Sequence, residues 1–402
     1  MITEQEFSTI QQQSAMRVAE VSMEYHRYLY AQVNWDNRLI CIRGARGVGK
    51  STLLLQHIRE QFGVTNKALY VSLDNMWFQT HAVMELVEYF YTHGGTHIFL
   101  DEIHYLAHWQ TIIKNIYDMY PHLHIVYTGS SMLQLSAHEG DLSRRQRVYT
   151  LHGMSFREYL VFEQYPIGEA ITLQQLLSEH EKIAMPLIQE HRILPLFSEY
   201  LQHGYYPFYK EEGNGFYERL QSVVRQIIEN ELPQVEDVSY STIKKIQKML
   251  IILAECVPFT PKMAEVYREL DTTRDSGLKM LYILQRADLL ALFSSEAKSL
   301  KALSKPDKIY LENTNLMYCL STYINVGTLR ETFFFNQMRC TQEVLLPKQG
   351  DFLINREYLF EVGGANKSYE QIKDIPNSYL AVDDIEIGTG HRIPLWMFGL
   401  LY

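Results

Sequence analysis

The chain has 402 residues, of which 47% are hydrophobic and 21% charged, and its formal net charge is -10. This length favours roughly two to three folded domains, and the composition excludes a disordered or low-complexity protein. The net negative charge argues against a protein that coats nucleic acid with a uniformly positive surface, so any contact with phosphates needs a local basic patch.

The polar start "MITEQEFSTIQQQS" has no apolar signal segment, and the longest apolar runs, such as "MLIILAECV", are too short to cross a bilayer. We therefore expect a cytoplasmic protein without membrane contacts. The four cysteines lack the close pairs of a zinc site and are expected to be reduced. The first segment, up to about Tyr30, is expected to be helical and to serve packing.

Residues 38–52, "RLICIRGARGVGKST", combine an apolar strand, a glycine loop and the start of the helical pattern "TLLLQHIREQF". The spacing G-x-x-x-x-G-K-S is that of a loop whose backbone N–H groups wrap phosphates. Lys50 would then reach the outer phosphates and Ser51 would ligate Mg²⁺, so we expect ATP and Mg²⁺ as cofactors. The predicted nucleotide-binding residues are Gly44, Ala45, Arg46, Gly47, Val48, Gly49, Lys50, Ser51 and Thr52.

The stretch "THIFLDEIHYL" at residues 96–106 is an apolar strand that ends in Asp101 and Glu102. Asp101 is predicted to hold the magnesium together with Ser51, and Glu102 to polarise the attacking water as the catalytic base. Two acids after a strand are often only a solvated strand end, but in combination with the glycine loop they are specific.

Two further strands are predicted nearby, "KALYVSLD" at residues 67–74 and "HLHIVYTGSS" at 122–131. The second ends in small hydroxyl residues, among which Ser130 is the candidate sensor of the γ-phosphate; a plain polar turn is the alternative. Strands that alternate with helices predict a parallel sheet with the ligand at the carboxyl ends of its strands.

Several segments together resemble a prokaryotic branch of AAA+ ATPases, related to archaeal and STAND-type ATPases, whose C-terminal half is a domain of unknown function. They are "IRGARGVGKSTLLLQ", "IFLDEIH", "VYTGSS", "LSRRQRVYTLHGMSFREYL", "LFSEYLQHGYYPFY", "KIYLENTNLMYCLS" and "VGTLRETFFFNQM". The resemblance spans nearly the whole chain and is least distinctive at residues 160–195. The loop of that family reads like "GPRRVGKT", from which Ala45 and Gly47 differ while Arg46, Gly49 and Lys50 agree.

The resemblance implies an α/β fold with a P-loop parallel sheet, followed by a helical and winged-helix region and a small α/β nuclease-like domain. The implied boundaries are 1–160 for the ATPase domain with its N-terminal helix, 161–235 for a helical lid or connector, 236–325 for a winged helix-turn-helix and 326–402 for a restriction-endonuclease-like domain. AAA+ kinship is compatible with an oligomer, although members of this branch need not form rings.

A Gly-Arg pair of the family falls on Arg144 and Arg145 here. The resemblance makes Arg145 the candidate for an arginine that senses nucleotide, including that of a neighbouring subunit, and such a finger stabilises the charge of the transferring phosphoryl group. Since the first position is Arg144 rather than glycine, it stays open which arginine acts, or whether this is a solvated basic turn.

Three helical patterns, "STIKKIQKMLIILAECV", "TPKMAEVYREL" and "DSGLKMLYILQRADLLALF", precede the strand "DKIYLEN". This is the outline of a winged helix-turn-helix. If it binds DNA, the helix that begins near Asp275 would enter a major groove, with Arg274 at its N-terminus and Lys279 on its face. Basic residues are few, so a contact with a protein partner, or a hinge, is the alternative.

The stretch "GDFLINREYLFEVGGANKSYEQI" is predicted to form a hairpin that pairs Asp351 with Glu361. Directly opposed like charges destabilise a sheet, so this pair indicates a shared cation or a shared proton. With Glu331 from the preceding helix, the acids resemble restriction-endonuclease sites, in which an acid is followed by E-x-K. Gly363 occupies the lysine position here, so Lys367 could replace that lysine only if the chain folds back at the glycine pair.

The sequence thus predicts a Mg²⁺-dependent ATP-binding and ATP-hydrolysing AAA+ type of ATPase whose nucleotide state controls a C-terminal DNA-binding or nuclease-like module. The alternative is a signalling or scaffold ATPase with a catalytically dead nuclease fold that binds a protein partner.

Overall fold

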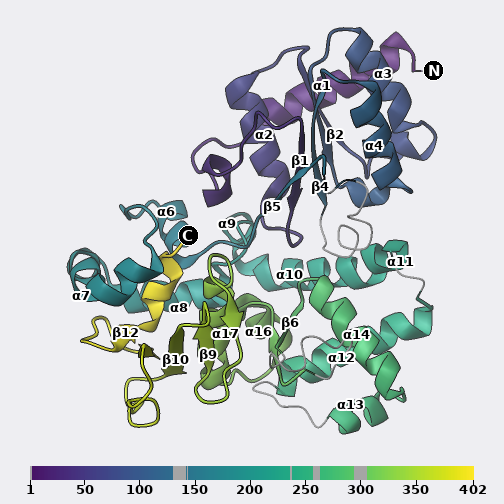
Figure 1. The fold of residues 1–402 in the computed structure, drawn as a ribbon. Coiled ribbons are helices and arrows are strands. Elements are labelled where there is room, and N and C mark those ends of the chain that lie inside the picture. Colours follow the sequence, from purple (N-terminus) through teal and green to yellow (C-terminus); the bar gives the residue numbers. More distant parts are fainter. Residues whose placement is uncertain (1, 130–141, 143, 236–237, 257–262, 294–305) are drawn as a thin grey trace. The chain divides into compact units, whose positions relative to one another are not determined.

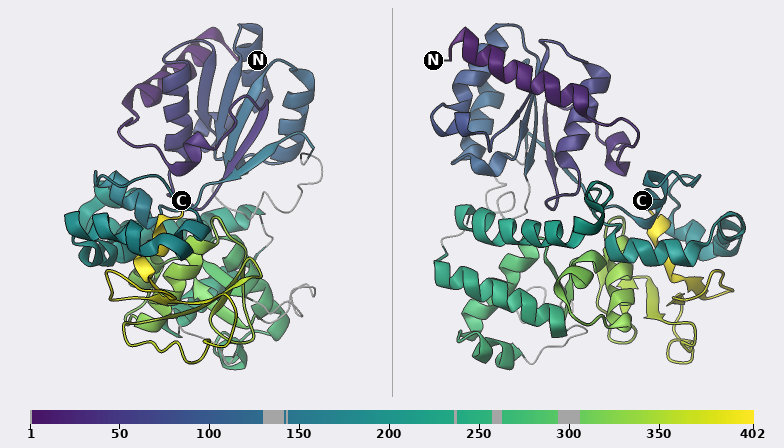
Figure 2. Two further views of the ribbon diagram at one scale, coloured as in Figure 1. Left: turned by 60° about the vertical axis from the view of Figure 1, so that its left-hand side comes forward. Right: turned by 180° about the vertical axis from the view of Figure 1, so that it is seen from behind.

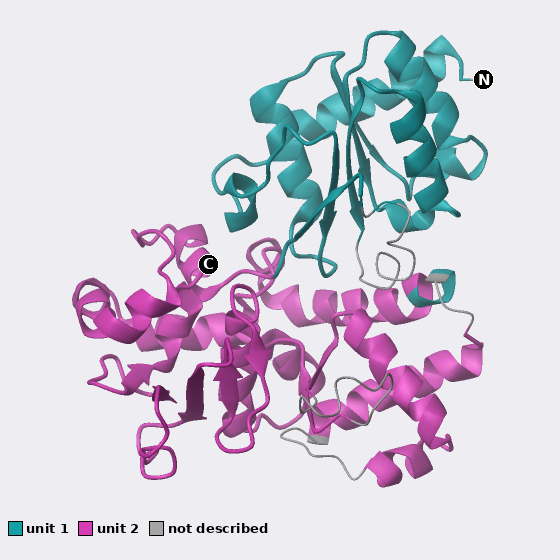
Figure 3. Cartoon of the chain, in the orientation of Figure 1, with its two compact units in different colours: residues 1–152, 232–237 teal, residues 153–231, 238–402 magenta. Residues whose placement is uncertain are grey.

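The computed structural model describes residues 2–129, 142, 144–235, 238–256, 263–293 and 306–402. They form two compact units, one of residues 1–152 and 232–237 and the other of residues 153–231 and 238–402 (Figure 3). The subdivision of residues 161–402 into three domains stays a prediction. None of the described helices is both long and apolar enough to span a membrane.

The first unit is built on a five-stranded sheet in which every neighbouring pair of strands is parallel (Figure 1). The order is β2-β3-β4-β1-β5, so β4 separates β1 from β3. The central strands are apolar in their middle residues, because helices cover both faces of a parallel sheet, and polar residues lie at their ends. The predicted parallel sheet is confirmed. Its strands are β1 (Leu39–Arg43), β2 (Ala68–Ser72), β3 (His97–Asp101), β4 (His124–Gly129) and β5 (Arg147–Thr150).

Helices lie on both faces of this sheet, α1 and α2 on one and α3 and α4 on the other (Figure 2). The helix predicted to reach about Tyr30 in fact ends at Glu20, because the backbone becomes extended at Val21. The helices of this unit are α1 (Glu4–Glu20), α2 (Lys50–Gln61), α3 (Val83–Thr92), α4 (Trp109–Met119) and α11 (Leu232–Val235), with 3-10 turns η1 (Tyr28–Ala31), η2 (Met76–Gln79) and η3 (Ile103–Tyr105).

The second unit begins with helices and continues with three helices and an antiparallel strand pair. The first group is α6 (Phe156–Phe162), α7 (Leu173–Glu190), α8 (Ile193–His203), α9 (Tyr209–Glu212), η4 (Gly213–Gly215), α10 (Phe216–Gln226) and the π-helical turn η5 (Ile227–Glu231). The second group is α12 (Tyr240–Cys256), α13 (Met263–Glu269), α14 (Arg274–Arg286), β6 (Leu290–Phe293) and β7 (Lys308–Leu311).

The second unit also contains a mixed sheet in the order β12-β11-β10-β9-β8. The pairs β8–β9 and β9–β10 are antiparallel, whereas β10–β11 and β11–β12 are parallel. The aromatic ring of Phe334, on α17, packs against Phe352 and Phe360 of this sheet. The remaining elements are α16 (Thr314–Leu320), α17 (Val326–Met338), β8 (Val344–Leu345), β9 (Phe352–Ile354), β10 (Tyr358–Gly363), β11 (Ser378–Val382), β12 (Arg392–Pro394) and η6 (Leu395–Leu400).

The predicted hairpin forms from β9 and β10. Phe352 lies opposite Phe360, and the N–H of Asp351 donates to the carbonyl of Phe360 at 3.0 Å. Asn355 and Arg356 make the turn with φ angles of 52° and 59°. The register therefore places Asp351 beside Glu361.

Buried imidazoles make the first unit sensitive to acid. Burial lowers the pKa of His57 to about 4, with a smaller contribution from His97, and the His57 ring is stacked on Trp35 with 3.7 Å between ring centroids. The ordinary pKa of histidine is about 6.5. The unfolded chain therefore binds the proton more readily than the folded unit, and stability that is complete above pH 6.5 is lost as the pH falls towards 4.

We expect the melting temperature of this unit, followed by tryptophan fluorescence, to fall between pH 7.5 and pH 5. The variant His57→Phe keeps a ring on Trp35 but cannot take up the proton, so its melting temperature should fall less over the same interval. Equal pH slopes for the two proteins would contradict this assignment.

Candidate functional site

The loop between β1 and α2 depends on glycine at three positions. Gly47 and Gly49 have φ angles of 86° and 99°, in the left-handed region that side chains disfavour. A Cβ on Gly44 would lie 2.2 Å from the carbonyl oxygen of Leu151, at the end of β5. The loop therefore needs these glycines to pass close to β5 and to enter α2.

Lys50 is buried, and its ammonium group lies inside the loop. Its Nζ donates to the carbonyl oxygens of Gly44 and Ala45 at 2.8 and 2.9 Å. Ser51 follows in the first turn of α2, at a helix N-terminus that favours negative charge. A compact loop with an ammonium group inside and a helix N-terminus behind it fits the phosphates of a nucleotide.

Asp101, at the end of β3, is 2% exposed and receives hydrogen bonds on both carboxylate oxygens. The hydroxyl of Tyr70, on β2, donates to Oδ2 at 2.6 Å, and the hydroxyl of Thr128, on β4, donates to Oδ1. Both partners are uncharged hydroxyls, so they donate to the carboxylate without placing a positive charge beside it. A carboxylate held in this way is a suitable ligand for a magnesium ion at this edge.

Glu102 is next in the chain and has a left-handed backbone, with φ 56° and ψ 48°. Its N–H donates to the Thr128 hydroxyl at 3.1 Å, and its Oε2 lies 3.3 Å from Nδ1 of the buried His104. Because of this left-handed backbone at Glu102, the side chains of Asp101 and Glu102 leave the chain in different directions. Ser130, predicted as the sensor on the next strand, lies outside the described residues.

Arg145 is paired within its own unit. Its Nε lies 3.2 Å from Oδ1 of Asp118, and its Nη2 lies 3.4 Å from Oδ2, at the end of α4. Arg144 is exposed. The role of either arginine towards a nucleotide stays a prediction.

Arg27 is a residue near the loop that the sequence did not single out. Its side chain is 6% exposed and donates to the carbonyls of Val48, in the glycine loop, and His152, the latter at 2.7 Å. Gln56, on α2, donates to the carbonyls of Ser22 and Tyr25, both at 2.8 Å. The segment after α1 is therefore fastened to the loop and to α2, an arrangement that a lone arginine in a polar segment does not reveal.

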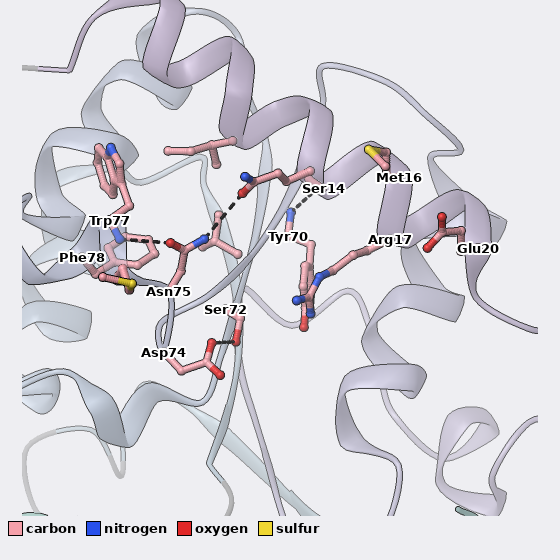
Figure 4. A pocket seen from close by; sticks show the side chains of 14 residues that line it. Ser14, Met16, Arg17, Glu20, Tyr70, Ser72, Asp74, Asn75, Trp77 and Phe78 are labelled. Atoms are coloured by element: carbon pink, nitrogen blue, oxygen red, sulfur yellow. Dashed lines mark hydrogen bonds between the residues drawn. The ribbon is translucent and has the colours of Figure 1, made fainter. Parts of the chain in front are cut away.

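A cavity of about 520 Å³ lies between α1 and the end of β2 (Figure 4). Tyr70 and Arg17 point towards each other from β2 and α1, with the guanidinium carbon 5.9 Å from the centre of the tyrosine ring. Burial, and then Asp101, raise the pKa of Tyr70, whereas Arg17 lowers it. The Tyr70 hydroxyl thus joins this cavity to the carboxylate of Asp101.

In the second unit, Lys308 lies between two of the predicted nuclease-like acids. Its Nζ is 3.3 Å from Oε2 of Glu331, on α17, and 3.5 Å from Oδ1 of Asp351, before β9. The hydroxyl of Tyr310 also donates to Glu331. Burial, and then Asp351, raise the pKa of Glu331, while Lys308 opposes the shift.

Glu361 and Lys367 form an ion pair, with 2.6 Å between Oε1 and Nζ. The chain folds back between them, and a Cβ on Gly363 would lie 2.7 Å from the side chain of Lys367. The other oxygen of Asp351, Oδ2, accepts the N–H of Val362 at 2.9 Å. The condition for Lys367 to approach Glu361 is therefore met.

The four residues of the predicted nuclease-like site thus lie around one hairpin, together with a fifth, Lys308, that the sequence analysis missed. Across the described part of the chain, no group of three or more His, Cys, Asp or Glu side chains could hold a metal ion. Lysine ammonium groups lie at the three carboxylates instead.

Arg274 and Lys279, the basic residues of the predicted recognition helix, are exposed on α14. That helix is capped by Thr273, whose side chain accepts the N–H of Ser276. The contact that this helix makes, with DNA or with a protein, stays a prediction.

Residues 36–160 match the sequence profile of a family described as an AAA domain. The match supports an AAA+ type of nucleotide-binding ATPase domain in this part of the chain. An uncharacterized protein of Methanocaldococcus jannaschii, MJ1637, is 26% identical over 397 residues, which cover 90% of this chain and 82% of that protein.

Two solved structures show weak similarity. One is the ORC1 protein of Aeropyrum pernix in complex with DNA, with 13% identity, a TM-score of 0.31, and coverage of 77% of this chain and 90% of that one. The other is AMPPCP-bound DnaA from Aquifex aeolicus, with 14% identity, a TM-score of 0.28, and coverage of 71% and 88%. At these TM-scores, we draw no conclusion about function from them.

The Lys308 contacts predict how the acid cluster responds to loss of its cation. Lys308→Met leaves Glu331 and Asp351 facing each other without the ammonium group, so the free energy of unfolding of the second unit should fall by about 1–3 kcal/mol at pH 8. The double variant Lys308→Met/Glu331→Gln should recover most of this loss, because one of the two charges is gone.

Denaturant unfolding, with and without millimolar Mn²⁺, measures both effects. Equal stability of Lys308→Met and the wild type would show that Lys308 does not balance these acids. Stabilisation by Mn²⁺ in Lys308→Met but not in the wild type would show that the acids can take a divalent cation in place of the lysine.

Proposed function

We propose that this chain is a Mg²⁺-dependent ATPase whose first unit binds and hydrolyses ATP. The observation that carries the proposal is the arrangement around the carboxyl edge of the parallel sheet, where the glycine loop holds Lys50 and β3 presents Asp101 and Glu102. The family match of residues 36–160 supports it.

In this proposal the loop N–H groups and Lys50 bind the phosphates, and Ser51 and Asp101 hold the magnesium ion. The ion supplies charge neutralisation at the phosphate oxygens. Glu102 orients the attacking water and accepts its proton, while Asp101 is held by two neutral hydroxyl donors. His104, 3.3 Å from Glu102, would restrain that side chain.

Arg145 is our candidate for the arginine that senses nucleotide, in this chain or in a neighbouring subunit. Its ion pair with Asp118 would then be exchanged for a contact with phosphate. Because the pair is partly exposed, its loss costs little, on the order of 1 kcal/mol or less.

For the second unit, we propose a winged helix formed by α12–α14 with β6 and β7, and a nuclease-like fold formed by α17 with the mixed sheet. The three helices followed by an antiparallel strand pair support the first, and the acids around the β9–β10 hairpin support the second. ATP binding and hydrolysis would control this part of the chain, with DNA as the ligand in one version.

A second candidate function is a signalling or scaffold ATPase whose nuclease-like fold is catalytically dead and binds a protein partner. The ammonium groups of Lys308 and Lys367 favour it, since they lie at all three carboxylates of the would-be site. Ammonium groups beside the carboxylates repel a metal ion and so weaken its attraction to the site.

The ATPase proposal is tested with the purified full chain, Mg²⁺ and ATP, with and without single- or double-stranded DNA. We expect turnover that falls at least 100-fold in Lys50→Ala and in Glu102→Gln, since one variant loses a phosphate contact and the other the catalytic base. Glu102→Gln should still bind ATP. Turnover that is unchanged in both variants would exclude this site.

The comparison with and without DNA in the same assay tests whether the second unit binds DNA or a protein partner. If DNA is the ligand, it should raise turnover at low salt, and the charge reversal Arg274→Glu/Lys279→Glu should remove the increase while basal turnover stays. Lys182→Glu, an 81% exposed lysine on α7, is the matched control. Turnover that ignores DNA at low salt would favour a protein partner.

Nuclease activity is tested separately with labelled DNA and Mg²⁺ or Mn²⁺. A working site predicts cleavage by the wild type that Glu361→Ala abolishes while ATP hydrolysis is retained, because Glu361 lies in the second unit. If the wild type cleaves nothing under conditions where it hydrolyses ATP, the catalytically dead alternative is favoured.

A further inference from the structure

Two side chains from neighbouring strands hold the carboxylate of Asp101 from opposite sides. Asp101 pairs in register with Ser72 of β2, and Tyr70 stands two residues earlier on the same face of that strand. A tyrosine is long enough to reach this diagonal partner, and its hydroxyl lies 2.6 Å from Oδ2. Thr128 of β4 donates to the other oxygen.

We propose that Tyr70 is a positioning residue for magnesium binding, which acts by fixing the carboxylate of Asp101. The inference rests on the proposed ATPase function and adds a residue outside the loop and strand motifs. The hydrogen bonds from Tyr70 and Thr128 fix the plane of the carboxylate before a nucleotide binds, so Asp101 need not reorient when the ion arrives.

Burial makes the tyrosine hydroxyl hard to replace. Asp101 is 2% exposed and Tyr70 is 3% exposed, so water has little access to the oxygen that would lose its donor. A buried carboxylate oxygen without a donor is costly and is free to turn towards another partner. Removal of this one hydroxyl should therefore leave the Asp101 carboxylate less firmly oriented and weaken magnesium binding.

Two residues of helix α1 contact Tyr70, one at its backbone and one at its ring. The hydroxyl of Ser14 accepts the N–H of Tyr70 at 3.0 Å, and the guanidinium of Arg17 lies beside the tyrosine ring (Figure 4). Both contacts come from α1, and the cavity of about 520 Å³ opens alongside them. The position of Tyr70 is thus set by its strand and by α1, away from the glycine loop.

Tyr70 and Thr128 have separable roles. Tyr70 contacts Asp101, whereas Thr128 contacts both Asp101 and the N–H of Glu102. Loss of the Tyr70 hydroxyl should therefore change the magnesium requirement with little effect on the catalytic base. Loss of the Thr128 hydroxyl should change the magnesium requirement and the maximal rate together.

The test compares wild type, Tyr70→Phe and Thr128→Val as full chains, in magnesium titrations of ATP hydrolysis at saturating ATP. We expect the half-saturating magnesium concentration of Tyr70→Phe to rise about ten-fold, with kcat at saturating magnesium within two-fold of wild type. Thr128→Val should show a similar rise and also a lower kcat. Binding of a fluorescent ATP analogue in EDTA should be the same for wild type and Tyr70→Phe.

Tyr120→Phe is the control, since it removes a hydroxyl from a buried tyrosine of the same unit at the end of α4. It should leave the magnesium titration unchanged. An unchanged half-saturation in Tyr70→Phe, or a loss of kcat without any shift in magnesium, would overturn the positioning role and leave Tyr70 as a stabilising residue only.

The wild-type titration separates this inference from the proposed function. If the wild type neither binds nor hydrolyses ATP with magnesium, the ATPase proposal fails and the role of Tyr70 falls with it. If the wild type is active and Tyr70→Phe has the same magnesium requirement, only the role of Tyr70 fails.

Discussion

A carboxylate removed from water must receive donors from the protein, and this requirement shapes both units of the chain. At the edge of the parallel sheet, Asp101 receives two hydroxyl groups. Around the β9–β10 hairpin, Glu331 and Asp351 share the ammonium group of Lys308, and Glu361 has that of Lys367. In each unit, the packing of neighbouring strands and helices brings these donors to the carboxylates.

In the first unit the donors come from the strands on either side of β3, and the order β2-β3-β4 brings them there. The sheet therefore does more than carry the loop and the acids: its lateral pairing supplies the hydrogen bonds that hold Asp101. The glycine loop needs a different local condition, a backbone that tolerates left-handed φ angles and the close passage of Leu151. The proposed nucleotide site thus depends both on long-range strand pairing, which holds Asp101, and on the local backbone freedom of the glycine loop.

The parts predicted correctly from sequence are those encoded locally. The loop, the strand that ends in Asp101 and Glu102, and the hairpin around Asn355 are short continuous segments whose apolar runs and turn residues determine their structure. The parallel sheet followed from the alternation of such segments. A helix up to Tyr30 was wrong because the carbonyls of Val21, Ser22 and Tyr25 accept hydrogen bonds from side chains of α2, which the local pattern does not show.

The parts that sequence reasoning missed are held by contacts between distant residues. Tyr70 is 31 positions from Asp101, Arg27 is 21 from Val48, and Lys308 is 23 from Glu331. No spacing rule connects such pairs, because the sheet order and helix packing decide which side chains meet. The approach of Lys367 to Glu361 could be stated only as a condition on the glycine pair, since a strand pattern gives no direction to the turn that follows it.

The two sets of donors differ in charge, and this difference separates the two sites chemically. Hydroxyl donors bind both oxygens of Asp101 without placing a positive charge beside it, which suits a group that must bind magnesium with a nucleotide. Ammonium donors bind Glu331, Asp351 and Glu361 and also place two positive charges beside the three carboxylates. A metal ion would have to compete with Lys308 for Glu331 and Asp351, and a lysine fixed in the chain has no translational entropy to lose on binding. The second site thus holds two ammonium groups against three carboxylates without a metal, and an ion bound there would have to displace Lys308 from Glu331 and Asp351.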